Sequence, residues 1–127
     1  VLVEHVNDAV HVSSGNVVCV EKETKLTYDV NYRARLVAAD TFAIKGYDAF
    51  YGFLSGICAG DHDITDIFVD ATYRIAEDKE RTGEALSSFL KKVDELSKIS
   101  DTKFTFTISS EMEELPEAMF EYCAKIN

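Results

Sequence analysis

The sequence predicts an α/β fold in three layers, with a mostly parallel sheet of about four to five strands and helices on both faces. Short apolar runs alternate along the chain with longer segments whose apolar residues recur at helical spacing. The run Ile67-Phe68-Val69 is apolar on consecutive residues, which is typical of a central strand covered on both sides. With 127 residues and 46% apolar content, residues 1–127 are expected to form a single domain.

The first third of the chain predicts a helix and two strands. Apolar residues at three- and four-residue intervals predict a helix over residues 2–10, which ends near the turn residues 13–15. Residues 17–20 and 36–39 are short apolar runs that predict buried strands, and Asp40 follows the second run. The polar stretch 21–33 fits either an edge strand or a loop. If the two strands are parallel, it must be a crossover of about a dozen residues.

The middle of the chain predicts a mostly buried helix over residues 46–60, followed by the strand that ends in Asp70. Gly52, Gly56 and Gly60 lie four residues apart on this helix. Each glycine weakens a helix by up to about 1 kcal/mol relative to alanine, so the sequence predicts that the three form a smooth ridge packed closely on the sheet.

The last third predicts a charged, exposed stretch over residues 73–81, an amphipathic helix over 84–98 and a strand over 103–108. The helix carries one apolar stripe, formed by Leu86, Phe89, Leu90, Val93 and Leu96. The strand alternates polar and apolar residues and is rich in phenylalanine. A further helix is expected to begin near Pro116.

Composition excludes several classes of partner. The net charge of −10 and the isoelectric point near 4.6 oppose binding to nucleic acid or anionic lipid by phosphate neutralisation. The basic residues nearest to forming a patch are Arg33 and Arg35, with Lys22 and Lys25 upstream. No segment has the length of a membrane span or the pattern of a leader, and the three cysteines form no C-x-x-C pair. We therefore expect a cytoplasmic protein with no membrane or nucleic-acid partner.

Three aspartates are candidate metal ligands. Asp40 and Asp70 directly follow predicted strands, and Asp66 lies close to Asp70 in the sequence. Ligands of open α/β folds bind beyond the carboxyl ends of the strands, and converging carboxylates there hold hard cations such as Mg²⁺. The sequence thus admits a magnesium-dependent phosphohydrolase or phosphotransferase. The alternative reading is that Asp70 caps the next segment or accepts hydrogen bonds from a loop.

The run Ile67-Phe68-Val69-Asp70 resembles the Walker B strand of RecA-like or AAA-like P-loop NTPases, and the likeness extends over residues 64–122. The resemblance implies that Asp70 helps to hold magnesium. The slot after Val20, where that family places its phosphate-binding loop, has no glycine. Ala71 stands where the catalytic glutamate is expected. The chain thus resembles an NTPase-like domain with a degenerate or absent phosphate loop, and is similar to bacterial proteins of this kind.

A receiver domain of two-component signalling is a competing resemblance, in which Asp70 would be the phosphorylated residue. That family also needs an adjacent acidic pair after its first strand, and Glu21 and Glu23 are not adjacent.

Three readings follow from these patterns. The first is a non-catalytic NTPase-like domain without a cofactor, which acts as an interaction or assembly module by binding a protein partner or a second copy of itself. The alternative is the magnesium enzyme that uses Asp40, Asp66 and Asp70. A third reading is a domain completed by another chain that supplies the glycine loop. The sequence does not name a substrate or a partner.

Overall fold

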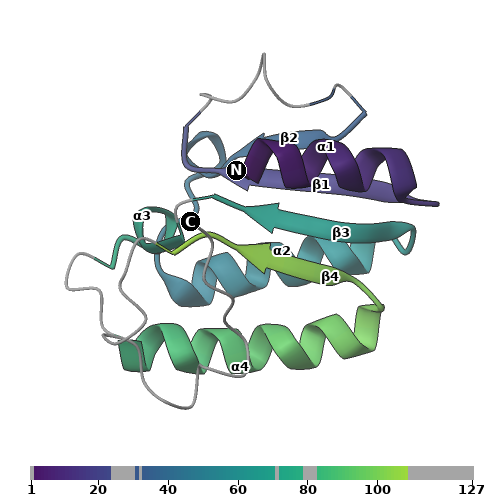
Figure 1. Ribbon diagram of the computed structural model, residues 1–127. Coiled ribbons are helices and arrows are strands. Elements are labelled where there is room, and N and C mark those ends of the chain that lie inside the picture. The colour runs from purple at the N-terminus through teal and green to yellow at the C-terminus, as the bar shows by residue number, and fades with distance from the viewer. Residues whose placement is uncertain (1, 24–30, 32, 71, 79–82, 109–127) are drawn as a thin grey trace.

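The computed structural model describes residues 2–23, 31, 33–70, 72–78 and 83–108. Four parallel strands form one sheet in the order β2-β1-β3-β4, as Figure 1 shows. The elements in chain order are α1 (Leu2–Val12), β1 (Asn16–Glu21), β2 (Arg35–Ala38), the 3-10 helix η1 (Ala39–Phe42), α2 (Tyr47–Gly60), β3 (Ile64–Val69), α3 (Thr72–Ala76), α4 (Gly83–Ser100) and β4 (Lys103–Phe106). The predicted α/β fold with a parallel sheet is confirmed.

Strand β3 lies between β1 and β4, as its continuous apolar run predicts. Phe68 is opposite Cys19 of β1 on one side and Thr105 of β4 on the other. Ile67 and Val69 are fully buried, and Phe68 is 5% exposed. Both faces of this strand are therefore covered, which explains why it lacks the alternation of a half-exposed strand.

Helices pack against both faces of the sheet, and the alternation of strand residues decides which side chains meet them. Val6 of α1 packs with Val17, Cys19 and Phe68 on one face. On the other face, a larger core formed with α2 and α4 buries strand residues such as Val18 and Val69. Figure 1 shows α1 apart from α2 and α4, which lie together. All five apolar residues predicted for the stripe of α4 are buried.

The turn between α1 and β1 fits closely against β3. The register between these strands shifts, because Asn16 pairs with Ile64 but Val17 pairs with Asp66. Thr65 is thus an extra residue on β3, a β-bulge. Its hydroxyl contacts the Ser13 hydroxyl. A Cβ on Gly15 would lie 2.0 Å from the Asp63 carbonyl oxygen, so this position requires glycine.

Two predictions are wrong, one about the glycines of α2 and one about the exposure of the stretch after Asp70. The glycines of α2 do not pack on the sheet, because Gly52, Gly56 and Gly60 are exposed and a Cβ on any of them would have no neighbour within 4 Å. The sheet-facing side of α2 is formed by larger residues instead. The stretch after Asp70 is not wholly exposed, since α3 buries Thr72, Tyr73, Ile75 and Ala76.

The expectations for most of the stretch 21–33 and for the helix near Pro116 lie outside the described residues.

Candidate functional site

Asp70 lies where the sequence predicts it, directly after β3 and half-buried at the carboxyl edge of the sheet. Its backbone N–H donates to the Val20 carbonyl oxygen at 2.8 Å, which continues the pairing of β3 with β1 by one residue. Its Oδ1 accepts a hydrogen bond from the Thr107 hydroxyl at 3.0 Å. Asp70 therefore joins the ends of β3 and β4, which is the structural role considered for it from the sequence.

The residues around Asp70 are held by further bonds to the same segment. The Thr72 hydroxyl, which is fully buried, donates to the Thr107 carbonyl oxygen at 3.0 Å. The Thr107 N–H donates to the Val69 carbonyl oxygen at 2.9 Å. These bonds fix the entry to α3 against the end of β4. The arrangement is a hydrogen-bonded corner at the carboxyl edge of the sheet.

Asp40 lies in η1, after β2, and is on the other side of β1 from Asp70. The Lys22 ammonium is 3.1 Å from its Oδ1 and 3.9 Å from Glu77 Oε1. Asp40 is thus engaged in an ion pair at the surface, and its N–H donates to the Lys22 carbonyl oxygen at 3.1 Å.

The expectation that Asp66 lies at a strand end with Asp40 and Asp70 is wrong. Asp66 is the third residue of β3, and four strand residues span about 13 Å, which separates it from Asp70. Its Oδ2 accepts a hydrogen bond from the Thr65 hydroxyl at 2.9 Å. Across the part of the chain that the structure describes, no three His, Cys, Asp or Glu side chains are grouped so that they could hold a metal ion.

Glu21 is a buried acid at this edge, where the sequence predicted only a polar stretch. It ends β1, is 2% exposed, and belongs to the same face of the sheet as Cys19. Burial, together with the smaller effect of the charges of Glu21 and Asp70, raises the pKa of the Cys19 thiol to about 12. Glu21 was counted with the polar stretch that follows it. The signal that could have placed Glu21 inside the strand is its spacing, because Val17, Cys19 and Glu21 are two residues apart and so lie on one face of β1.

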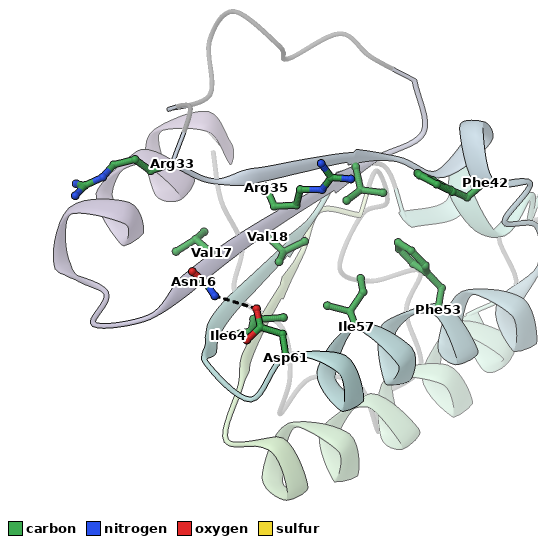
Figure 2. Close-up of a pocket in the computed structure, with 11 residues that line it drawn as sticks. Asn16, Val17, Val18, Arg33, Arg35, Phe42, Phe53, Ile57, Asp61 and Ile64 are labelled. Carbon is green, nitrogen blue, oxygen red and sulfur yellow. Dashed lines mark hydrogen bonds between the residues drawn. The ribbon is translucent and has the colours of Figure 1, made fainter.

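A second candidate site is a cavity of about 430 Å³ that lies between β2, β1 and α2 (Figure 2). We call this cavity the β2–α2 groove. Its lining residues are Asn16, Val17, Val18, Arg33, Arg35, Val37, Phe42, Phe53, Ile57, Asp61 and Ile64.

The floor and walls of the β2–α2 groove are apolar. Val18, Val37 and Ile64 are 4%, 7% and 4% exposed and belong to the main core. Phe53 and Ile57 of α2 are half-buried and stand above them. Phe42 is 57% exposed, although it is one of the largest apolar side chains in the molecule. The groove therefore presents an apolar surface of which part is in contact with solvent.

The polar rim of the groove has one acid, which accepts two hydrogen bonds, and two arginines, neither of which forms an ion pair with a described residue. Asp61 accepts hydrogen bonds from the Asn16 amide nitrogen and from the Asp63 N–H, both at 2.9 Å. Arg35 is exposed, and Figure 2 shows its side chain extended along β2 in the direction of Phe42. The Arg33 guanidinium points away from the other labelled residues in the same view. Arg35 is thus the cation positioned over the apolar floor.

Only part of this site was predictable from the sequence. It singled out Arg33 and Arg35 as a basic pair, but it could not show that β2 and α2 leave a cavity between them. Phe53 and Ile57 belong to the helix over residues 46–60 that was predicted to be mostly buried, but both are only half-buried in the structure.

Comparison with protein-family models, with curated proteins and with solved structures finds no match for this chain. The resemblance to P-loop NTPases stays a prediction, and a functional assignment must come from the residues themselves. Within the described residues, no helix is long and apolar enough to cross a membrane.

Proposed function

We propose that this chain is a non-catalytic, NTPase-like interaction module, and that its β2–α2 groove holds an extended segment of a partner protein. The observation that carries the proposal is the apolar cavity of about 430 Å³ between the terminal strand of the described sheet and a helix. This volume lies within the range of about 300–1,000 Å³ found for binding pockets. A cavity of this size can take two or three side chains of a partner.

The position of β2 supports an extended partner. Among the described strands, β2 is at one end of the sheet and pairs only with β1. A terminal strand offers backbone groups to which an added peptide can bind as a further strand. Alternate side chains of such a peptide would point to the face of the sheet on which Val37 and α2 line the groove.

The half-exposed apolar residues also support binding at this place. Burying about 100 Å² of apolar surface contributes about 2.5 kcal/mol, and Phe42, Phe53 and Ile57 together offer surface of this order. A partner that covers Phe42 would remove from water a large side chain that the chain leaves 57% exposed.

The carboxyl edge supports a structural role for its acidic residues. Asp70 accepts its bond from Thr107, and Asp40 is paired with Lys22. The alternative of a magnesium-dependent phosphohydrolase or phosphotransferase gains less support, because Asp66 lies about four strand residues from Asp70. An Asp70→Ala variant with undiminished metal affinity and phosphatase activity would eliminate that alternative.

Two titrations test the proposal. Isothermal titration of the chain with ATP or GTP and Mg²⁺ is expected to show no saturable binding, and micromolar affinity would contradict a non-catalytic module.

In the second titration, a blocked pentapeptide of alternating threonine and leucine is added to the ¹⁵N-labelled chain. The amide resonances of β2 and α2 are expected to shift in a saturable way. Ile57→Ser should weaken this binding, whereas Ile99→Ser, at a site 84% exposed on α4, should not.

A further inference from the structure

We infer that the partner segment of the β2–α2 groove is acidic as well as apolar, with a glutamate or aspartate that pairs with Arg35 and aliphatic side chains that fill the floor. This inference rests on the proposed function and deepens it by naming the chemistry of the partner. Four observations carry it: the cation over an apolar floor, the satisfied acid at the rim, the alternation along β2, and the contrast with the charge of the whole chain.

The first step is the state of Asp61 and Arg35, the charged groups of the groove other than Arg33, whose guanidinium points away. Asp61 is already bonded to Asn16 and to the Asp63 N–H. No ion pair is recorded for Arg35 with any residue in the described part of the chain, and its side chain lies along the groove (Figure 2). A guanidinium in this position offers a planar set of donors that fits a carboxylate. The Arg35 guanidinium is therefore available to bind a carboxylate of a partner.

The second step is the spacing along β2. Arg35 and Val37 both line the groove and are two residues apart, so they lie on the same face of the strand. An added strand that runs parallel to β2 presents its own alternate residues at the same spacing. A carboxylate opposite Arg35 then places an apolar residue opposite Val37 and another near Phe42. The predicted segment is acidic, any residue, aliphatic, any residue, aliphatic.

The third step is the charge of the chain. The net charge of −10 opposes an acidic partner over most of the surface. Charges more than about 8 Å from a site are largely screened at physiological ionic strength, so Arg35 and its immediate neighbours decide the local preference. An acidic segment is thus directed to the groove and is repelled elsewhere. This contrast gives specificity as well as attraction.

Three blocked pentapeptides test the inference with the same ¹⁵N-labelled chain. The first is glutamate-threonine-leucine-threonine-leucine, the second has glutamine in place of glutamate, and the third keeps glutamate but has serine in place of both leucines. We expect the first peptide to bind about fivefold more tightly than the second, the range of a partly exposed ion pair. We expect the third to bind at least tenfold more weakly than the first, because it buries no aliphatic side chain.

Two variants locate the effect. Arg35→Gln is expected to abolish the fivefold preference for glutamate over glutamine. Lys103→Gln removes the same charge from an exposed residue of β4, at the opposite end of the sheet, and is expected to leave the preference intact.

The outcomes separate this inference from the proposed function. If the first two peptides bind equally and Arg35→Gln changes nothing, the acidic preference is overturned while the groove remains a binding site. If the third peptide binds as tightly as the first, the apolar groove is not the site and the proposed function fails. If none of the peptides shifts a resonance of β2 or α2 at millimolar concentration, both are overturned.

Discussion

Alanine at Gly56 is expected to stabilise the protein, because the glycines of α2 lie on its exposed side. Gly56 is in the interior of a 14-residue helix, and a Cβ added there would meet no atom within 4 Å. Glycine in an exposed helix interior costs about 0.8–1 kcal/mol relative to alanine, through the greater freedom of the unfolded chain. Gly56→Ala should therefore raise the free energy of unfolding by about that amount.

The effect should be measurable by thermal and urea unfolding. For a domain of this size, 1 kcal/mol corresponds to a rise in Tm of about 3–6 °C. Gly52→Ala has the same surroundings, and the two substitutions together should add about 1.6–2 kcal/mol. The urea midpoint should move without a change in the slope m.

Gly15→Ala is the matched control. Its Cβ would lie 2.0 Å from the Asp63 carbonyl oxygen and 3.0 Å from Thr65 Cγ2, so the turn would have to move. We expect a loss of stability of more than about 1 kcal/mol. A fall in Tm for Gly56→Ala would refute the reasoning, because it would mean that these glycines approach another surface closely.

Three further predictions concern the core and the carboxyl edge. Thr107→Val removes the hydroxyl that donates to Asp70 and should cost about 1–2 kcal/mol in urea unfolding; an unchanged midpoint would show that this bond contributes nothing. Leu86→Ala, at a fully buried site on α4, should cost about 2–5 kcal/mol, while Ile99→Ala on the same helix should change stability by less than about 0.5 kcal/mol. Because the pKa of Cys19 is raised from 9.0 to about 12, the folded state holds its thiol proton longer than the unfolded state does, so this group's contribution to stability is complete below pH 9 and is lost as pH rises toward 12. Urea midpoints measured across this range should fall more for the wild type than for Cys19→Ala, and parallel curves would contradict the burial of this thiol.

The fold was largely predictable because its elements follow simple periodicities. The consecutive apolar residues of β3 indicated a strand covered on both sides, and the stripe on α4 identified its five buried residues. Such patterns depend only on which side of an element faces the core.

The glycines of α2 could not be placed by spacing alone. Residues four apart share one side of a helix, but the pattern does not state whether that side faces the sheet or solvent. The larger residues Phe50, Leu54 and Cys58 took the buried side, and the glycines were left on the other.

The candidate site was predictable only in part, since it depends on contacts between distant segments. Asp70 was correctly placed at the carboxyl edge, but its bond to Thr107 joins residues 37 positions apart. Asp66 was misplaced because it was grouped with Asp70 by closeness in the sequence, whereas it lies inside β3, which begins at Ile64. The β2–α2 groove forms from segments that range from Asn16 to Ile64, and no local pattern records the space between them.

The most direct test of the interaction module is a set of intermolecular nuclear Overhauser effects between the unlabelled glutamate-leucine pentapeptide and the ¹³C-labelled chain. The peptide's leucine methyl groups are expected to show contacts with the side chains of Val37, Phe53 and Ile57, which line the groove. Contacts confined to other surfaces, such as the side chains of β4, would contradict the assignment of the β2–α2 groove as the binding site.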